Sequence, residues 1–359
     1  MINRRDFLKM SAAAFTAVTT GLTAGCTTAA PVADDPIPTE PLRQLAAKKG
    51  LLIGSAFANH ALMRDPEYGQ ILSREFNCIV GENNMKMDAI QQARGQFDFA
   101  QADAMMEFAV QHDMKVRAVP LVWHDALPRW AMNQKFPRQE ALGILKDHIF
   151  AVMSHFKGRV FAWDVLNEGL NDKGPGLREK SVWFKSIGPG YVDEVFHMAH
   201  EADSKALLFY NDYNMDGISP SSDRCYNWAK NMLARNVPLH GIGLQYHVQV
   251  ENYPSQKAVI RNIRRFNDLG LAVHITELDV WLPAKATALH LQQQANVYRS
   301  IIEAVLASPR CPAIVLWGFT DRYSWVHSTS NGQYDHGLIF DRDYRPKPAY
   351  NAIAAALQK

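Results

Sequence analysis

Hydrophobic positions follow two alternating patterns over most of the chain. Short runs that are almost continuously apolar and rich in β-branched residues predict strands buried on both faces. These runs span Leu51–Phe57, Phe76–Val80, Val116–Val122, Val160–Leu166, Ala206–Tyr210, Gly241–Leu244, Leu271–Ile275 and Ala313–Phe319. Segments with apolar residues at helical spacing lie between them, so strand and helix alternate. Eight such units in about 310 residues predict an α/β fold, a single (β/α)₈ barrel.

Two of the intervening segments show their helical stripes clearly. One stripe consists of Ala102, Met105, Met106, Ala109 and Val110. The other consists of Ile260, Ile263 and Phe266, and Gly270 follows it as the expected C-terminal cap. We expect both stripes to pack against the barrel.

Residues 1–26 have a different composition, which predicts an export signal. Arg4 and Arg5 precede an apolar run rich in Ala and Thr, and paired arginines indicate the twin-arginine route. The residues ending at Cys26 are similar to a bacterial lipobox, but Leu22 lies one position too far from the cysteine. Lipidation of Cys26 therefore stays open. The alternative, an amphipathic helix packed on the domain, is disfavoured because the run has no helical stripe.

The remaining chain divides into two parts by composition. Residues 27–44 are rich in proline and predict a linker, and residues 45–357 predict the barrel. We expect an exported protein of the periplasm or cell envelope, either lipid-anchored at Cys26 or secreted, and a monomer.

Composition excludes several classes of protein. A hydrophobic content of 47% excludes a disordered chain. The net charge of +2 is spread without basic runs, which argues against a nucleic-acid partner. No stretch approaches the roughly 18 uncharged apolar residues of a transmembrane helix. Cys78 and Cys311 lie in apolar runs as small core residues, and the spacing of Cys78, Cys225 and Cys311 selects neither a zinc site nor a disulfide.

Polar residues recur at the ends of the predicted strands. In a (β/α)₈ barrel the carboxyl ends of the strands carry the active site, so their joint placement outweighs the structural roles that each could have alone. These residues are Glu82, His124, Glu168, Asn211, Asp212, His247, Glu277 and Trp317.

Two of these carboxylates suit the cleavage of a glycosidic bond. Glu168 ends the fourth strand and Glu277 the seventh, so they enter one cleft from opposite sides. One would protonate the leaving oxygen while the other attacks or stabilises the anomeric carbon. Asn167 would bond a sugar 2-hydroxyl, and His247 would orient the nucleophile with Asp279 fixing its imidazole.

Aromatic residues after the strands favour a sugar ligand. Sugar faces carry C–H groups that pack on aromatic rings, although we expect at least a third of these residues to serve packing alone. The candidates are Trp123, Trp130, Trp317, Trp325, Tyr213 and Tyr246.

Nine segments occur in a recognisable order along the chain: Glu82–Lys86, Phe97–Asp103, Leu121–His124, Trp163–Glu168, Asn211–Asn214, Gly241–His247, Thr276–Asp279, Trp317–Trp325 and Pro346–Tyr350. In these segments and their order, the chain resembles the endo-1,4-β-xylanases of glycoside hydrolase family 10 over about residues 45–357.

This resemblance implies a retaining hydrolase of xylan and xylooligosaccharides that needs no cofactor or metal. Glu168 would be the acid/base and Glu277 the nucleophile. Glu82, Asn83 and Lys86 would hold the sugar at subsite −2. Gln245 and His247 would lie around the nucleophile, and Trp123, Trp317 and Trp325 would wall subsite −1. His124, Asn167, Tyr213 and Asp279 complete the expected set of supporting residues.

Three departures from the family pattern concern the sugar subsites. Val119 stands where the family usually has a histidine, Ala126 follows Asp125 where an amide is usual, and Met87 replaces a tryptophan. A histidine at position 119 would reach subsite −1, whereas a valine packs the barrel. Two other functions stay open: a retaining barrel hydrolase of β-glucan or mannan, and a non-catalytic polysaccharide-binding barrel.

Overall fold

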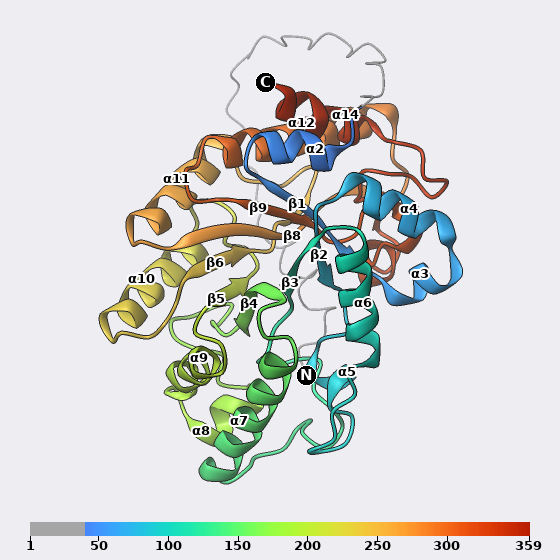
Figure 1. The fold of residues 1–359 in the computed structure, drawn as a ribbon. Coiled ribbons are helices and arrows are strands. Elements are labelled where there is room, and N and C mark those ends of the chain that lie inside the picture. The colour runs from blue at the N-terminus through green and yellow to red at the C-terminus, as the bar shows by residue number, and fades with distance from the viewer. Residues whose placement is uncertain (1–39) are drawn as a thin grey trace.

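The computed structural model describes residues 40–359, which form a closed barrel of eight parallel strands surrounded by helices (Figure 1). Each of the eight runs predicted as strands overlaps one barrel strand, so the (β/α)₈ prediction is confirmed. The barrel strands are β1 (Leu52–Phe57), β2 (Cys78–Gly81), β3 (Lys115–Ala118), β4 (Val160–Asn167), β5 (Leu207–Asp212), β6 (Gly241–Leu244), β8 (Ala272–Pro283) and β9 (Ala313–Leu316).

Each barrel strand pairs in parallel with the next, and the last closes on the first. Gly54 of β1 lies opposite Cys78 of β2 on one side and opposite Val315 of β9 on the other. All eight strands run in the same direction, so their carboxyl ends form a single rim that carries the functional loops.

Strand β8 continues beyond the barrel for a total of 12 residues. Its second half pairs with β7 (His247–Gln249) in parallel and with β10 (Tyr334–Asp335) in antiparallel orientation. His247 and Asp279 are register partners in this extension. The extension therefore places Glu277 and Asp279 on a sheet rather than on a free loop.

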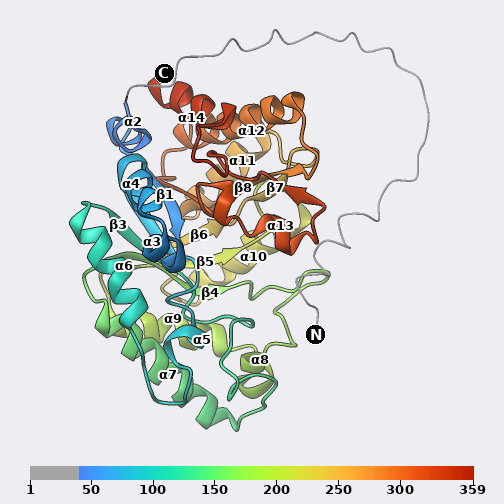
Figure 2. The ribbon, with the colours of Figure 1, turned by 90° about the vertical axis from the view of Figure 1, so that its right-hand side faces the viewer.

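Helices cover the outside of the barrel, and Figures 1 and 2 show them as a ring around the strands. The first and last helices of residues 40–359, α2 and α14, lie side by side across the strand closure. The helices are α2 (Leu42–Lys48), α3 (Asn59–Arg64), α4 (Pro66–Glu75), α5 (Met87–Ile90), α6 (Ala100–Gln111), α7 (Arg138–His155), α8 (Val182–Ile187), α9 (Tyr191–Ala202), α10 (Pro220–Ala234), α11 (Gln256–Asp268), α12 (Ala288–Leu306), α13 (Val326–Thr329) and α14 (Pro348–Gln358), with a short 3₁₀ turn η1 (Asp321–Tyr323).

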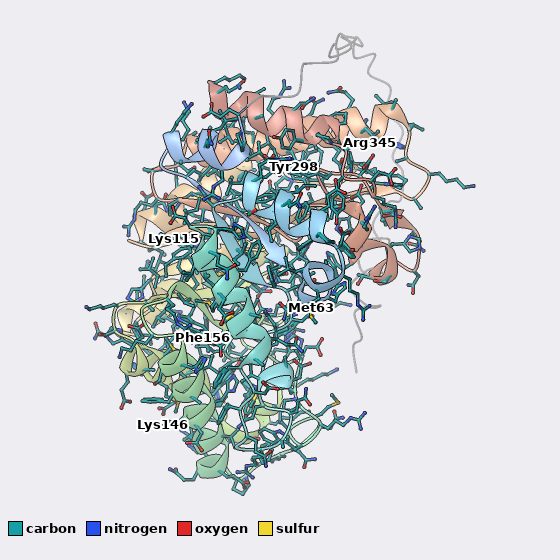
Figure 3. The ribbon with its side chains drawn as sticks, turned by 45° about the vertical axis from the view of Figure 1, so that its right-hand side comes forward. Met63, Lys115, Lys146, Phe156, Tyr298 and Arg345 are labelled. Carbon is teal, nitrogen blue, oxygen red and sulfur yellow. The ribbon has the colours of Figure 1, made fainter. Side chains whose placement is uncertain are left out.

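The core separates apolar and polar side chains in the usual way. Phe156 and Tyr298 are fully buried, whereas Met63 is 85% exposed (Figure 3). Within the barrel, Arg117 of β3 forms a buried bidentate ion pair with Asp164 of β4 at 2.5 Å. Both charges are paired, which offsets the cost of removing them from water.

Glycines on β6 make room for functional side chains inside the barrel. A Cβ atom at Gly243 would lie 2.3 Å from Asn211 Oδ1, and one at Gly241 would lie 2.3 Å from the ring of Phe209. Any larger residue at position 243 would displace Asn211. Gly243 on β6 thus leaves space for the side-chain amide of Asn211.

The structure corrects two details of the sequence analysis. The third strand ends at Ala118 rather than Val122; Pro120 has no N–H to donate, and beyond it Leu121 and Val122 form only isolated backbone hydrogen bonds with β4. Val110 is 75% exposed at the end of α6, and Phe108 takes its place in the apolar stripe. The expected cap at Gly270 is confirmed, since its φ of +87° is the left-handed conformation that glycine adopts readily.

Other predictions meet the structure in different ways. Cys78, Cys225 and Cys311 are buried and free. Helix α2 begins at Leu42, inside the segment predicted as linker. The predicted export signal and Cys26 lie outside the described residues. Within residues 40–359, no helix combines the length and the apolar character that a bilayer crossing requires.

Candidate active site

A cleft of about 650 Å³ opens at the carboxyl ends of the barrel strands. Most of the residues predicted from the sequence line it together, and they come from nearly every part of the rim. The predicted residues in the lining are Lys86, Trp123, His124, Asn167, Glu168, Tyr213, Gln245, His247, Glu277, Trp317 and Trp325. Glu82, Asn83 and Asp279 do not line the cleft.

Glu168 directly follows β4 and adopts a φ of +52°, which is unfavourable for a residue with a side chain. Its Oε2 accepts a hydrogen bond from Trp123 Nε1 at 2.9 Å, and its Oε1 accepts one from Gln245 Nε2 at 3.0 Å. Burial raises the pKa of the Glu168 carboxyl despite these donors, and the nearby charge of Glu277 adds to the rise. Such a carboxyl holds its proton to higher pH than an ordinary glutamate.

Glu277 lies within β8 and has a different set of neighbours. Its Oε1 accepts from Asn211 Nδ2 at 2.7 Å, and its Oε2 contacts His247 Nε2 at 3.2 Å. Burial favours the neutral form, but the hydrogen bond and charge of His247, with the amide of Asn211, outweigh burial and lower the pKa of Glu277. There is therefore a range of pH in which the Glu277 carboxyl is ionised while the Glu168 carboxyl is still protonated.

His247 connects the nucleophile candidate to a fully buried carboxylate. Its Nδ1 lies 2.9 Å from Asp279 Oδ1, and Asp279 is 0% exposed. Burial lowers the pKa of His247, but the charge and hydrogen bond of Asp279, with those of Glu277, raise it to about 10. The indoles of Trp281 and Trp325 donate to Asp279 at 2.6 and 2.8 Å and fix its orientation. The imidazolium therefore donates from both nitrogens, one to each carboxylate.

Asn211 and Asn167 tie the two carboxylates to one polar network. The side-chain amides of Asn167 and Asn211 hydrogen-bond at 2.8 Å, and Thr276 Oγ1 donates to Asn211 Oδ1 at 2.7 Å. Asn211 occupies the space that Gly243 leaves on β6. The absence of a side chain at Gly243 therefore leaves room for the amide that bonds to Glu277.

Lys86 lines the cleft beside two tryptophans, Trp123 and Trp317. Its Nζ lies 5.3 Å from the ring centroid of Trp123 and 5.9 Å from that of Trp317, and it donates to Asn83 Oδ1 at 2.8 Å. Glu82 is half-buried directly after β2, and Asn83 is exposed. The structure therefore gathers the three residues expected at subsite −2, with the lysine alone lining the cleft.

The predicted residues His124 and Tyr213 lie near the acid/base candidate. His124 Nε2 is 4.0 Å from Glu168 Oε2, and burial together with the charge of Arg178 lowers the pKa of His124 to about 4. It is thus neutral at ordinary pH. Tyr213 donates its hydroxyl proton to Asp172 Oδ1 at 2.5 Å.

Sequence reasoning missed an arginine that contacts the backbone of the acid/base candidate. Arg178 Nε donates to the Glu168 carbonyl at 3.0 Å, and its two terminal nitrogens bind Asp172 at 2.9 Å each. Nη2 also donates to the Tyr213 hydroxyl at 3.0 Å. This guanidinium therefore holds the carbonyl of a residue whose φ is unfavourable. Arg178 lies in a loop without strand or helix periodicity, so no pattern in the sequence marks it.

The aromatic candidates divide into cleft and packing residues, as expected. Trp123, Trp317, Trp325 and Tyr213 line the cleft. Tyr246 is 1% exposed in the core, and Trp130 donates its indole proton to the Gln91 carbonyl. Trp281 also lines the cleft and was missed, because it lies in the unexpected extension of β8.

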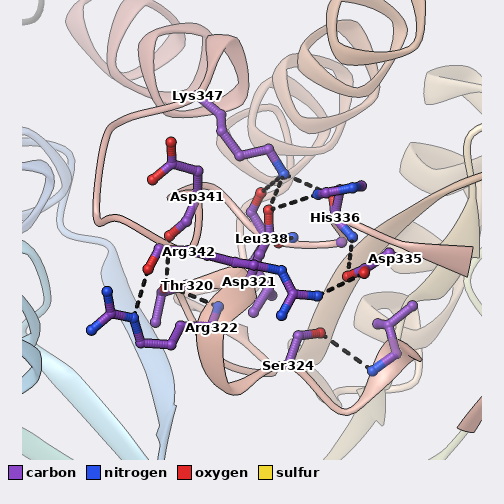
Figure 4. A network of polar contacts seen from close by, with 12 residues as sticks. Thr320, Asp321, Arg322, Ser324, Asp335, His336, Leu338, Asp341, Arg342 and Lys347 are labelled. Carbon is purple, nitrogen blue, oxygen red and sulfur yellow. Dashed lines mark hydrogen bonds and ion pairs between the residues drawn. The ribbon is translucent and has the colours of Figure 1, made fainter. Parts of the chain in front are cut away.

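A polar network surrounds Asp321, which lies between Trp317 and Trp325 in the sequence (Figure 4). At its centre the buried Lys347 Nζ donates to Asp321 Oδ2 at 2.9 Å and to the carbonyls of His336 and Leu338 at 2.7 and 2.6 Å. Asp321 also accepts from the Leu338 N–H at 2.9 Å. These bonds fix the turn between the two tryptophans from behind. The segment Pro346–Tyr350 therefore supports the site without lining it.

Two departures from the family pattern have clear positions. Val119 is 2% exposed among core side chains and does not line the cleft. Ala126 has a φ of +48°, and its N–H bonds Asp125 Oδ1 at 2.9 Å. Asp125 lines the cleft. The position of Val119 favours its interpretation as a packing residue.

No group of three or more His, Cys, Asp or Glu side chains within residues 40–359 is arranged to hold a metal ion. What the cleft offers is a proton-holding carboxyl, an ionised carboxylate and aromatic walls. Pairs of carboxyls whose environments push their pKa values apart can divide the roles of acid and nucleophile.

Comparisons with known proteins agree with this geometry. The family model "Glycosyl hydrolase family 10" matches residues 41–356. Endo-1,4-beta-xylanase B of Thermotoga neapolitana is 42% identical over 324 residues, which cover 89% of this chain and 92% of that protein. The crystal structure of xylanase 10B from Thermotoga maritima superimposes with a TM-score of 0.85 at 42% identity, covering 89% of this chain and 98% of that one. Xylanase 10B from Thermotoga petrophila, solved with xylobiose, gives a TM-score of 0.86 at 40% identity, covering 90% and 99%. The chain therefore belongs to glycosyl hydrolase family 10.

Proposed function

We propose that the cleft cleaves internal β-1,4-xylosidic bonds of xylan by double displacement, with Glu277 as nucleophile and Glu168 as acid/base. The observation that supports this assignment is the opposite shift of the two carboxyl pKa values, raised at Glu168 and lowered at Glu277. Family membership and the xylanase relatives support xylan as the substrate. The chain is thus an endo-acting glycoside hydrolase.

In the first step Glu277 attacks the anomeric carbon of the sugar at subsite −1. The C–O bond to the leaving sugar breaks, and Glu168 gives its proton to the departing oxygen. The product is a xylosyl ester on Glu277 and an ionised Glu168. Because the pKa of Glu168 is raised, its carboxyl keeps the proton that this step consumes.

In the second step a water molecule attacks the same carbon. Glu168, now a carboxylate, removes the proton from the water, and the bond to Glu277 breaks with the electron pair returning to the carboxylate. Two inversions leave the anomeric configuration unchanged. The donors His247 and Asn211 at 3.2 and 2.7 Å stabilise Glu277 as a leaving carboxylate.

The walls of the cleft would orient the chain for this attack. Trp123 and Trp317 offer ring faces to the sugar, and Lys86 between them offers a charged donor to its hydroxyls. Asn167, whose amide belongs to the network around Glu277, would bond the 2-hydroxyl, a contact that strengthens in the transition state.

The assignment is tested by trapping the intermediate. A dinitrophenyl 2-deoxy-2-fluoro-β-xylobioside forms the glycosyl ester rapidly and hydrolyses it slowly, because fluorine destabilises the positive charge of both transition states. Digestion and mass spectrometry should place the sugar on Glu277. A label on any other carboxylate overturns the assignment. Turnover of xylan beside β-glucan and mannan tests the substrate, and faster turnover of either of the latter contradicts xylan.

We also propose export through the twin arginines Arg4 and Arg5, with Cys26 as a candidate lipid anchor. A fully acylated cysteine holds a protein at the membrane, whereas one chain holds it only marginally. Fractionation of cells expressing the wild type and Cys26→Ala tests this. Release of the variant alone from membranes supports the anchor, and an unlipidated wild type refutes it.

A further inference from the structure

The cleft extends well beyond the two carboxylates on the side of Glu168. There it passes over the loop after β4, the loop between β5 and α10, and the loop between β7 and α11. Its lining on this side mixes apolar side chains with hydroxyl and amide side chains and one exposed aromatic ring. The polar and aromatic residues are Asn171, Asn214, Ser219, Ser221, Asn252 and Tyr253, and the apolar ones are Leu170, Met215, Ile218, Val248 and Pro254. A chain of several sugars leaving Glu168 in this direction would meet both hydrogen-bonding groups and apolar surface.

Two arginines line this half of the cleft, and only one of them is neutralised. Arg178 forms a bidentate ion pair with Asp172 at 2.9 Å. Arg224, the fifth residue of α10, has no carboxylate within 4.0 Å among residues 40–359, and its exposure is intermediate. The guanidinium of Arg224 therefore brings a full positive charge to the wall of the cleft.

The Arg224 guanidinium is held in place by neutral acceptors. Its Nη2 donates to the Asp172 carbonyl at 3.1 Å and to Ser221 Oγ at 2.9 Å. Nη1 makes no hydrogen bond to any residue between 40 and 359. A fixed guanidinium with an unused terminal nitrogen loses little conformational freedom when it binds an anion.

Nearby carboxyl groups compensate this charge poorly. Asp212 and Asp216 also line the cleft, but both are buried, and burial raises the pKa of Asp212 to about 8 and that of Asp216 to about 7. The Asp172 carboxylate is already paired with Arg178. Arg224 is thus a cation on the wall of the cleft whose own contacts are all to uncharged oxygen atoms.

A chain of xylose carries hydroxyl groups and no charge, so neutral donors would suffice to bind it. A full cation is matched by a carboxylate, and the carboxylates that a xylan chain carries are those of uronic acid side groups. We propose that Arg224 binds the carboxylate of a uronic acid branch on the xylan chain and thereby favours acidic xylans over neutral ones. This inference rests on the proposed function and adds a class of substrate to it.

The test compares glucuronoxylan with the same polymer after reduction of its carboxyl groups to alcohols. Chain length and branch positions are then equal, and only the charge differs. For the wild type, kcat/KM should be about threefold to tenfold higher on the acidic polymer, as expected for one charge-assisted contact in a partly solvated cleft. This preference should weaken as salt is added, because counterions screen it.

Arg224→Gln removes the charge while keeping the length and polarity of the side chain. The ratio of kcat/KM on acidic and reduced polymer should fall toward one, and any general loss of activity cancels in that ratio. Arg224→Lys should retain part of the preference. Arg264→Gln, an exposed arginine outside the cleft, should keep the wild-type ratio.

Two outcomes overturn the inference. One is a wild-type enzyme with equal kcat/KM on both polymers, a measurement that needs no variant. The other is a preference that Arg224→Gln leaves intact. Failure of the proposed function differs from both, since neither polymer would then be hydrolysed.

Discussion

Glu168 and Glu277 are the same residue type at equal exposure, 14% for each side chain, yet their surroundings act in opposite directions. Glu168 accepts bonds from the neutral donors Trp123 and Gln245, which do not outweigh its burial. Glu277 faces the imidazolium of His247, which does outweigh burial. Burial removes the hydration that stabilises a carboxylate. A cation compensates for this loss by electrostatic attraction as well as by a hydrogen bond, whereas a neutral donor supplies the hydrogen bond alone. The hydrogen bond and charge of His247 are thus the largest contributions that lower the pKa of Glu277 below that of Glu168.

Removing the nucleophile should give the largest effect. Glu277→Ala should lower kcat on xylan by at least about 10⁴-fold, because the covalent route is lost. Azide should at most yield an inverted sugar azide, since it attacks the anomeric carbon directly. Circular dichroism should match the wild type. Near-normal hydrolysis by the variant contradicts the role of Glu277.

Removing the acid should affect two substrates unequally. Glu168→Ala should lose about 10² to 10⁴-fold in kcat/KM on xylan, whose alkoxide leaving group needs a proton. Dinitrophenyl xylobioside should still release its phenol in a burst, because that leaving group needs little protonation. Equal losses on both substrates would remove Glu168 from this role.

Removing the imidazolium of His247 beside Glu277 should reduce the difference between the pKa values of Glu168 and Glu277. Activity requires ionised Glu277 and protonated Glu168, so kcat/KM falls below the pKa of the former and above that of the latter. Without the imidazolium in His247→Asn, the pKa of Glu277 rises, and the acidic limb of the profile should move to higher pH. Trapping rates with the fluorinated substrate should show the same limb. An unmoved acidic limb shows that His247 does not set the charge of Glu277.

Arg178 is the cation near Glu168, so its removal tests how a positive charge affects the pKa of the acid/base candidate. Its charge lowers the pKa of Glu168, and its Nε holds the Glu168 carbonyl at 3.0 Å. Arg178→Gln should lower kcat/KM about threefold to tenfold, the worth of a typical hydrogen bond, and move the alkaline limb to higher pH. Arg178→Lys should restore the limb but not the full rate. If neither variant moves the limb, the role of Arg178 is confined to loop structure.

Position 119 should give the smallest effect on catalysis. The family pattern predicts that Val119→His regains a contact at subsite −1, but Val119 lies in the core at 2% exposure. We expect the variant to lose stability by about 1 to 3 kcal/mol through overpacking and to gain no turnover on xylooligosaccharides. Thermal melting beside kinetics measures both. A variant that melts normally and turns over faster supports the lost-contact interpretation instead.

Much of the fold and of the site could be predicted from the sequence, because both depend on local patterns. The apolar runs determine the strands, and the strand ends determine which polar residues reach the rim. Glu168, Glu277 and His247 were identified in this way and Gln245 from the family resemblance, and all four line one cleft.

Other features were decided by contacts between distant parts of the chain. The extension of β8 exists because β7 and β10 pair with it, and that pairing brings Trp281 to the cleft. Arg178 reaches the Glu168 carbonyl through a loop without periodicity. The direction of each carboxyl pKa depends on a partner from another strand, as His247 is for Glu277. A sequence pattern reports which face of an element is buried, whereas the charge of a buried group is set by whatever residues the fold places beside it.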